Sequence, residues 1–293
     1  MFPYYFLKKR NQVSKSENPF TPGGYYSPIP SITEIKAYNF DSPLPKKLPG
    51  IDLNSREQMN LLNSFETFYN ELPFSYEKSE GLRYYYNNGF YTFSDAIFLY
   101  CMIRHLKPKK IIEVGSGFSS SVTLDTNEKF MENSIECVFI EPYSERLESL
   151  LTNKDKGNIK ILKKRLQEIP LEIFEELREN DILFIDSTHV SKFNSDVNYV
   201  IHKILPCLAY GVHIHFNDVF YPFEYPREWL LRGNAWNEQY ILRAFLEFNS
   251  EFKIVMFNSY LESMYEVEIR SRFPLLYKST GQSIWLKKYK LVK

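Results

Sequence analysis

The stretch that decides the fold is KKIIEVGSGFSS, residues 109–120. Ile111 to Val114 form a short apolar run of the kind that becomes a buried parallel strand. Gly115 and Gly117 then let the backbone turn sharply and approach a ligand closely, and the next residues begin a helix with free N–H groups. A strand, a glycine turn and a helix in this order predict the first unit of an α/β sheet, with a ligand site at the turn.

The same alternation of apolar runs and helical segments continues to the C-terminus. Further strands are expected at 137–141, 158–162, 181–186, 212–217, 252–258 and 283–288, and helices between them at 120–130, 145–153, 171–180, 195–208 and 237–249. Strands that alternate with helices predict βαβ units with right-handed crossovers. We therefore expect an α/β fold with a doubly wound, mostly parallel sheet of seven strands.

The N-terminal third has a different character. Its first fifty residues are rich in Pro, Gly, Ser, Asn and Tyr, and their aromatic content favours an arm that packs on the protein, because disordered segments are usually poor in aromatics. One amphipathic helix is expected to begin after Asp52 or Asn54 as its cap and to end near Pro73, and a second, apolar nearly all round and hence buried, is expected at about 94–106. We expect residues 1–92 to be an arm and helical extension that packs on the core, and residues 93–293 to be the ligand-binding domain.

Composition excludes several classes of protein. Lys plus Arg and Asp plus Glu both number 36, so a zero formal charge argues against a general nucleic-acid binder. No run approaches the roughly 18 apolar residues that a membrane helix needs. The first residues, MFPYYFLKKR, reverse the charge order of a secretory signal, which favours a cytoplasmic protein.

Polar residues at the predicted strand ends indicate which ligand the sheet binds, because open α/β sheets bind ligands outside the carboxyl ends of their strands. Glu113 precedes the glycine turn, and Ser120 stands where a dinucleotide fingerprint has its third glycine. A carboxylate suits an ammonium group and repels a pyrophosphate. The turn thus favours S-adenosylmethionine, whose amino-acid tail is zwitterionic, over a dinucleotide.

A second acid follows the next predicted strand, where Glu141 precedes Pro142. A carboxylate at this position can accept both hydroxyls of a ribose. That role supports a cofactor that contains adenosine, whether S-adenosylmethionine or a dinucleotide. The alternative is that Glu141 is a solvated acid at a helix start.

Four stretches together resemble a class I S-adenosylmethionine-dependent methyltransferase and are, more narrowly, similar to the bacterial methyltransferase family 24; they span residues 107–121, 137–142, 181–199 and 211–229. The resemblance implies that Glu113, Gly115 and Gly117 hold the methionine end, Glu141 the ribose, and Gln167 or its neighbour the adenine edge. The full set of implied cofactor-binding residues is Glu113, Gly115, Ser116, Gly117, Phe118, Ser119, Glu141, Pro142, Gln167, Asp186 and Ser187.

The ends of the fourth and fifth predicted strands carry the candidate catalytic residues. Methyl transfer to a hydroxyl needs an aligned acceptor, exclusion of water and removal of one proton. His189 is the first choice for the general base, because imidazole titrates near neutral pH. Asp218 either orients that imidazole or acts as the base itself, and Asp186 completes the group. The alternative for His189 is a structural bond to a backbone carbonyl.

A divalent metal ion is an open alternative. Some O-methyltransferases of this fold bind magnesium through an Asp after strand four and an Asp-Asn pair after strand five. Asp186 matches the first position, whereas Asn217 and Asp218 have the pair in reverse order. Hard cations prefer such oxygen ligands, while the nearby histidines suit a transition metal.

The segment that follows strand five, residues 220–229, is stiffened by prolines and crowded with aromatic residues. It fits a lid that binds the acceptor, with a ligand-free surface loop as the alternative. The expected substrate-binding residues are His215, Tyr221, Tyr225 and Arg227.

These patterns predict an S-adenosylmethionine-dependent enzyme that methylates a hydroxyl of a small molecule or a glycan. The alternatives are an NAD(P)-dependent oxidoreductase and a non-catalytic binding protein that retains the fold. The expected partner is the acceptor, with no nucleic acid and no membrane, and homo-oligomerisation is left open.

Overall fold

The computed structural model describes residues 21–155 and 157–289 of the 293-residue chain. Phe20 and the rest of residues 1–20 of the expected arm lie outside the described residues. The chain divides into two compact units. The described part of the first comprises residues 21–42 and 226–235, and the second comprises residues 43–225 and 236–289.

In the first unit two short helices contact each other, α2 (Ile32–Ala37) and α11 (Arg227–Leu231). A capping box begins α2, because the hydroxyl of Ser31 accepts the Glu34 N–H while the Glu34 carboxylate accepts the Ser31 N–H. This unit combines two segments, residues 21–42 and 226–235, that lie far apart in the sequence. The predicted boundary at residue 92 remains a prediction.

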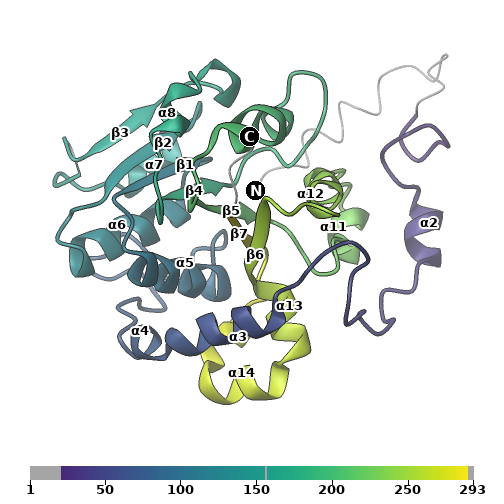
Figure 1. The fold of residues 1–293 in the computed structure, drawn as a ribbon, viewed down its shortest axis with the longest axis horizontal. Coiled ribbons are helices and arrows are strands. Elements are labelled where there is room, and N and C mark those ends of the chain that lie inside the picture. Colours follow the sequence, from purple (N-terminus) through teal and green to yellow (C-terminus); the bar gives the residue numbers. More distant parts are fainter. Residues whose placement is uncertain (1–20, 156, 290–293) are drawn as a thin grey trace. The chain divides into compact units, whose positions relative to one another are not determined.

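The second unit contains a seven-stranded sheet in the order β3-β2-β1-β4-β5-β7-β6, as Figure 1 shows. The strands are β1 (Lys110–Val114), β2 (Glu136–Ile140), β3 (Ile159–Leu162), β4 (Ile182–Ile185), β5 (His213–Asn217), β6 (Phe252–Phe257) and β7 (Ser283–Lys288). The pairs among β1 to β5 are parallel, and β7 runs antiparallel to both β5 and β6. The predicted α/β sheet of seven mostly parallel strands is confirmed, with β7 antiparallel to its two neighbours.

The helices and turns of the second unit connect these strands. They are α3 (Ser55–Ser64), α4 (Glu66–Asn70), α5 (Phe93–Leu106), α6 (Phe118–Phe130), α7 (Glu145–Leu150), η1 (Leu166–Glu168), α8 (Glu172–Glu175), α9 (Asp196–Tyr199), η2 (Val200–Ile204), α10 (Leu205–Cys207), α12 (Glu238–Leu246), α13 (Asn258–Met264), α14 (Glu266–Arg272) and η3 (Pro274–Lys278). The buried helix expected at 94–106 is confirmed as α5, whose residues from Ser94 to Ile103 are all buried.

Local structure differs from the prediction in three places. The helix expected between Asn54 and Pro73 begins at Ser55, as predicted, but is divided into two helices, α3 and α4. The helix expected at 171–180 shrinks to α8, because the carboxylate and backbone of Asp181 bond with Arg178 and turn the chain into β4. Helices α13 and α14 had no counterpart in the prediction.

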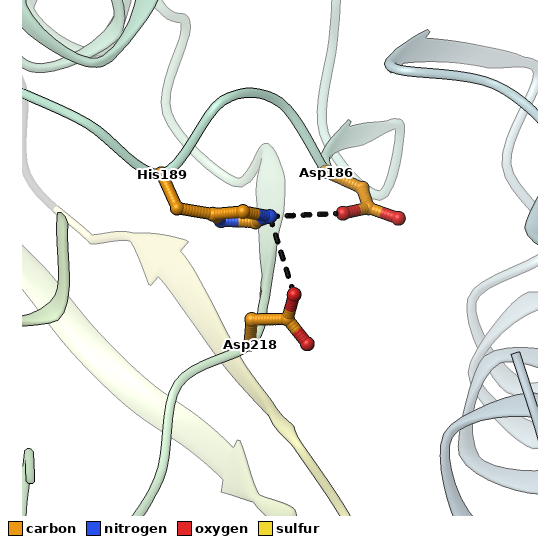
Figure 2. Close-up of side chains that lie close together, drawn as sticks. All are labelled: Asp186, His189 and Asp218. Atoms are coloured by element: carbon orange, nitrogen blue, oxygen red, sulfur yellow. Dashed lines mark ion pairs between the residues drawn. The ribbon is translucent and has the colours of Figure 1, made fainter. Parts of the chain in front are cut away.

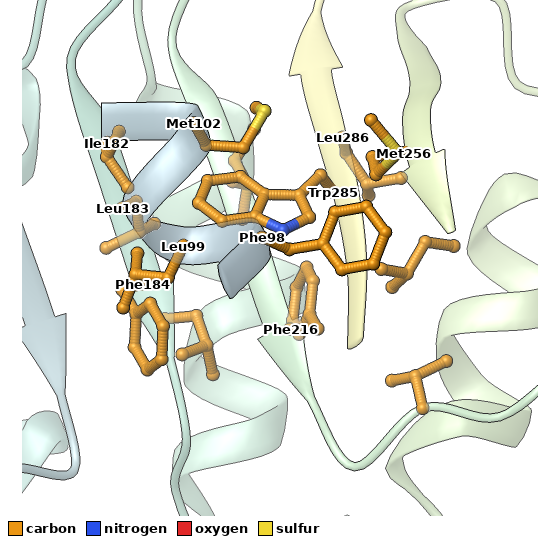
Figure 3. Packing of buried hydrophobic residues seen from close by; sticks show 14 of the residues in the cluster. Phe98, Leu99, Met102, Ile182, Leu183, Phe184, Phe216, Met256, Trp285 and Leu286 are labelled. Carbon is orange, nitrogen blue, oxygen red and sulfur yellow. The ribbon is translucent and has the colours of Figure 1, made fainter. Parts of the chain in front are cut away.

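The core lies between α5 and the centre of the sheet. Figure 3 shows Trp285 of β7 packed among Phe98 and Met102 of α5 and Phe216 of β5. Trp285 is fully buried, and β4 is buried along its whole length. Burial on both faces explains why these strands are continuous apolar runs. Within the described residues, none of the helices combines the length and the apolar character needed to cross a bilayer.

Candidate active site

The glycine turn after β1 is held against the end of β4. Because β1 and β4 pair in parallel, with Val114 opposite Ile185, the Asp186 N–H donates to the Val114 carbonyl at 2.8 Å. Gly115 has a φ of +79°, and a β-carbon there would lie 1.7 Å from the backbone oxygen of Asp186. Gly115 is therefore required both by its backbone angle and by space.

Gly117 has a different role from the one expected. Its φ is 179°, an extended conformation that any residue adopts, and a β-carbon there would meet only the flexible Arg146 side chain at 3.2 Å. The expectation that both glycines permit the sharp turn is therefore correct only for Gly115. Gly117 begins α6, where its N–H donates to the Ser120 hydroxyl at 3.0 Å.

Glu113 is completely buried beneath the same turn. Its Oε1 accepts the hydroxyls of Ser119 at 2.6 Å and Ser120 at 2.8 Å. Burial raises the pKa of Glu113 to about 8, against the effect of these two hydrogen bonds. Its Oε2 is also buried and has no hydrogen-bond partner among the described residues. One oxygen is thus committed to α6 and the other remains available to a ligand.

Glu141, just after β2, borders the other side of the turn. Its Oε2 accepts the Ser116 N–H at 3.1 Å, and its Oε1 accepts the Tyr143 N–H at 2.8 Å. A carboxylate oxygen has two lone pairs, so both oxygens can accept a further bond. Glu113 and Glu141 therefore flank one turn, as a single ligand that spans both would need.

Two further polar atoms near this turn are buried without a partner in the described part of the chain. They are the hydroxyl oxygens of Ser116 and of Ser187, which follows Asp186. Buried hydroxyls are normally hydrogen-bonded, and a buried polar atom without a partner costs about 1–3 kcal/mol. Together with Glu113 Oε2 they indicate a site for a polar ligand at the joint between the β1 turn and the end of β4.

The remaining predicted cofactor residues lie at the rim of this site or beyond it. The Phe118 ring stacks on Phe90, with ring centroids 5.9 Å apart, and the Arg146 guanidinium lies 4.1 Å from the Phe90 ring centre. Pro142 is exposed. Gln167, in η1, donates its side-chain N–H to the Asn194 carbonyl at 2.7 Å and so joins the loops that follow β3 and β4.

The predicted catalytic residues meet at one point (Figure 2). The Nε2 atom of His189 lies 3.3 Å from Asp186 Oδ1 and 3.2 Å from Asp218 Oδ2. Its Nδ1 atom lies 2.8 Å from Oε2 of Glu238, the first residue of α12. The side chains of His189 and Glu238 are 5% and 1% exposed. Three carboxylates therefore surround one buried imidazole.

This arrangement shifts the pKa values of His189 and Asp218. Burial opposes a positive charge on His189, but the hydrogen bonds to Asp186 and Glu238 and the charge of Asp218 outweigh it and hold the pKa of the imidazole well above its usual range. Burial also raises the pKa of Asp218, against the attraction of His189. Both ring nitrogens of His189 therefore face carboxylate oxygens.

Asp186, His189 and Asp218 each place one possible metal-ligand atom within 4.8 Å of the others. Asp186 and Asp218 converge, but His189 Nε2 stands between them. The Asn217 amide nitrogen donates to Asp218 Oδ1 at 3.1 Å, and its buried Oδ1 has no hydrogen-bond partner among the described residues. Magnesium prefers oxygen ligands in octahedral geometry. The donors that converge here include an imidazole nitrogen, which differs from the all-oxygen set of two carboxylates and one amide expected from the sequence.

His215 lies in the core, which corrects its expected role in substrate binding. Its ring stacks on Phe184 with centroids 3.9 Å apart and contacts the Trp285 edge at 4.8 Å. The residue is completely buried, and burial lowers the pKa of the imidazole well below its usual range. A neutral ring packed between two aromatic side chains does not face an acceptor at the sheet edge.

The aromatic segment after β5 packs inward instead of forming an open lid. Tyr221 is 6% exposed and packs against Phe257 and Tyr260, and its hydroxyl donates to the Pro45 carbonyl. Tyr225 is 1% exposed. Because both side chains serve the core, they do not offer the free stacking faces that the lid interpretation needs. Arg227 begins α11 in the first unit.

Sequence reasoning missed two acids that support the site. Glu238 lies 49 residues from His189, and Asp95 lies 187 residues from Gln282, whose N–H it accepts at 3.0 Å. Asp95 is buried at the start of α5, and burial raises its pKa to about 6. Only helix-start positions signalled these acids, and that signal does not reveal a distant partner.

Comparisons with known proteins agree with the resemblance seen in the sequence. A family model described as a methyltransferase domain, of methyltransferase family 24, matches residues 112–219. An uncharacterized protein from Archaeoglobus fulgidus is 35% identical over 170 residues, which are 56% of this chain and 76% of that protein.

Two solved structures are similar at lower identity. The methyltransferase PaMTH1 from Podospora anserina, bound to S-adenosylhomocysteine, is 13% identical over 84% of this chain and 100% of its own, with a TM-score of 0.43. The O-methyltransferase TomG from Streptomyces achromogenes, in complex with S-adenosylmethionine, is 12% identical over 82% of this chain and 92% of its own, with a TM-score of 0.44. Likeness at this level adds no argument about the present site.

Proposed function

The chain belongs to methyltransferase family 24, a family of class I S-adenosylmethionine-dependent methyltransferases, and we propose that it methylates a hydroxyl oxygen of a small molecule or sugar with Asp218 as the general base. Family membership argues against the oxidoreductase alternative. The observation that carries the proposal is the carboxylate–imidazole group Asp186–His189–Asp218 beside the glycine turn, because methylation of a hydroxyl requires removal of its proton.

The residues around the turn fit S-adenosylmethionine. We propose that Glu113 Oε2 and the hydroxyls of Ser116 and Ser187, all buried without partners in the described chain, receive the polar groups of its amino-acid tail. Glu141 then accepts the ribose hydroxyls. When bound, the cofactor supplies a methyl group already activated by a sulfonium. Acids on both sides of the turn favour a ligand with positive charges.

We propose further cofactor contacts along the same edge of the sheet. Gly115 brings the backbone close to the ligand, Gly117, Phe118 and Ser119 line the start of α6, and Pro142 follows the ribose acid. Gln167 is proposed for the adenine edge. It joins two loops beyond the strand ends, and that contact supports a position at the edge of the site.

Roles in proton transfer follow from hydrogen-bonding capacity. The sequence favours His189 as the base, yet both ring nitrogens face carboxylates, so the imidazole has no free lone pair for a substrate proton. Asp218 has a carboxylate that is 12% exposed and a raised pKa, which suits a group that takes a proton near neutral pH. We assign His189 the role of orienting that carboxylate.

The proposal is tested in two steps. Calorimetry should show saturable binding of S-adenosylmethionine and S-adenosylhomocysteine, and turnover with methyl-labelled cofactor should be screened over sugar and phenolic hydroxyls. Asp218→Asn should lower kcat by about 10²–10⁴-fold while cofactor affinity is kept. Glu80→Gln, at an exposed acid, is the matched control. A fully active Asp218→Asn enzyme would refute the assignment of the base.

A further inference from the structure

Arg146 of α7 lies against the glycine turn that follows β1. Its Cδ atom is 3.2 Å from the place that a β-carbon on Gly117 would take. The same turn is bordered by Glu141, which accepts the Ser116 N–H, and by the buried Glu113. Arg146 therefore brings a positive charge to a turn that two acids also border.

The guanidinium of Arg146 rests on the ring of Phe90. Its central carbon lies 4.1 Å from the centre of that ring, and Phe90 in turn stacks on Phe118, with ring centroids 5.9 Å apart and planes at 12°. A cation over an aromatic ring is attracted by the negative face of the ring. The N–H groups of a guanidinium point along its own plane, so in such a contact they remain available to a carboxylate, which they can bind through two parallel hydrogen bonds.

Phe90 belongs to an ordered segment, residues 83–91, that we call the strap. At its start the buried Arg83 pairs with Asp125 of α6 at 2.7 Å. Near its end Asn88 Oδ1 accepts the N–H groups of Phe90 and Tyr91, both at 2.8 Å. The Phe90 side chain is nevertheless 65% exposed. An exposed ring on a backbone fixed in this way has a defined position beside Arg146.

The donors on this side of the turn are free to bind an anion. Arg146 forms no ion pair within residues 21–155 and 157–289, whereas the guanidinium of Arg83 bonds three carboxylates. Helix α6 has 13 residues and begins at Phe118, and the N–H groups in the first turn of a helix lack intrahelical acceptors and favour a negative group. Arg146 and the start of α6 therefore offer donors to one anionic group.

The amino-acid tail of the proposed cofactor contains such a group. Its ammonium suits Glu113 Oε2, which is buried and has no partner in the described part of the chain. The carboxylate of the tail is attached to the same carbon atom as the ammonium, so it must enter the site close to Glu113. Two carboxylates repel each other at short range, and a buried carboxylate without a counter-charge is costly. Binding of the complete tail therefore needs a cation near the turn.

We propose that Arg146, held in place by Phe90, binds the carboxylate of the cofactor's amino-acid tail and so selects ligands with the complete zwitterionic tail. The inference rests on the proposed binding of S-adenosylmethionine at this turn and adds the residue that recognises its anionic end. Arg146 is then a cofactor-binding residue, and Phe90 is a positioning residue that acts through it. The strap thereby gives the N-terminal part of the chain a role in cofactor binding.

The test compares two ligands that differ only in the carboxylate. S-adenosylhomocysteine has the complete tail, whereas S-adenosyl-3-thiopropylamine keeps the amine and lacks the carboxylate. In calorimetry with the full chain, Arg146→Met should raise the Kd of S-adenosylhomocysteine about tenfold or more. The same change should leave the Kd of the amine within about twofold. Arg146→Lys keeps the charge but loses the paired donors, so its Kd for S-adenosylhomocysteine should lie between those of the unchanged protein and Arg146→Met.

Two further variants separate this role from a structural one. Arg165→Met is the matched control, because the Arg165 side chain is 65% exposed and pairs with Glu168 at 2.6 Å. It should leave both Kd values unchanged. Phe90→Leu should raise the Kd of S-adenosylhomocysteine about two- to fivefold without affecting the amine. Retained binding of the amine shows that a variant is folded and that the rest of its site is intact.

The proposed function and this inference give different failures. If neither ligand binds the unchanged protein, the proposed cofactor site is wrong and the role of Arg146 falls with it. If S-adenosylhomocysteine binds but Arg146→Met weakens both ligands equally, or weakens neither, only the role of Arg146 is overturned. An unchanged protein that binds the amine as tightly as S-adenosylhomocysteine would overturn that role as well.

Discussion

The backbone oxygen of Asp186 lies 1.7 Å from the position that a β-carbon on Gly115 would take. The turn after β1 therefore lies directly against the first residue after β4. The proposed cofactor site and the proposed proton-transfer group are neighbours for this reason. The parallel register of β1 and β4 sets it, with Val114 opposite Ile185.

Gly115→Ala should therefore disrupt the site. The methyl group would overlap backbone that two strands hold in place, and φ at this position is +79°. We expect a loss of about 3 kcal/mol of unfolding free energy and no detectable binding of S-adenosylmethionine. Gly89→Ala is the control, because φ is +75° there and nothing lies within 4 Å of the added carbon. It should cost about 1 kcal/mol. Equal effects of the two changes in a urea titration would contradict this reading.

Glu141→Ala should weaken cofactor binding more than it slows the chemical step. Hydrogen bonds to a charged group contribute about 1.5–3 kcal/mol, so we expect the Kd for S-adenosylmethionine to rise about tenfold or more. At saturating cofactor kcat should change little, since Glu141 is proposed to contact the ribose and not the acceptor. Glu145→Ala, an exposed acid at the start of α7, should leave the Kd unchanged. Calorimetry decides, and an unchanged Kd for Glu141→Ala counts against the ribose role.

Arg83→Met should destabilise the fold strongly. The buried Arg83 guanidinium bonds Asp125 at 2.7 Å, Asp155 at 2.7 Å and Glu128 at 2.9 Å. Its removal leaves buried carboxylates without a counter-charge, which costs about 3–5 kcal/mol. Arg270→Met is the control, because its ion pair with Glu266 is exposed and should contribute less than about 0.5 kcal/mol. Urea unfolding of both variants measures the difference, and similar midpoints would show that the buried network is dispensable.

Glu262→Gln should change how stability depends on pH. Burial raises the pKa of Glu262 to about 8, against hydrogen bonds from Ser94 and the Gly281 N–H. The folded state therefore binds the proton more tightly than the unfolded state, whose pKa is near 4.5. The stability from this group is complete below that value and is lost as pH rises through about 8.

At pH 8 Glu262→Gln should accordingly be more stable than the unchanged protein by about 1–3 kcal/mol, because glutamine has no charge to bury. The advantage should shrink as pH falls toward 5. Thermal unfolding across this range measures it. Glu266→Gln, on the exposed face of α14, should show no such trend. An advantage independent of pH would assign the effect to packing instead of ionisation.

Much of the sheet was predictable, since its strands are short apolar runs buried on both faces. The residues of β1 and β4 have that pattern, and both strands lie where expected. Helices were harder to predict. The end of α8 depends on one carboxylate, Asp181, that turns the chain by bonding to Arg178, and periodicity does not show such a contact.

The sequence predicted which strand ends form the candidate site, but not the role of each residue there. Asp186, His189 and Asp218 meet as expected, because parallel strands end at one edge of the sheet. His215 was misassigned, because strand position alone does not say which side chain faces the core. Glu238 was missed, because its pairing with His189 depends on where α12 docks.

The sequence by itself determined the strand–turn–helix unit and placed Glu113 and Glu141 at the ends of its first two strands. It thereby predicted a binding site for a cationic ligand that contains adenosine. These features are local, because the hydrophobic periodicity, the glycines and the charged side chains all belong to residues that are close in the sequence. Only the tertiary structure decided that His189 is enclosed by three carboxylates, which hold the pKa of its imidazole well above the usual range. A pKa depends on burial and on charges within a few ångströms, and folding brings those charges together from β4, β5 and α12.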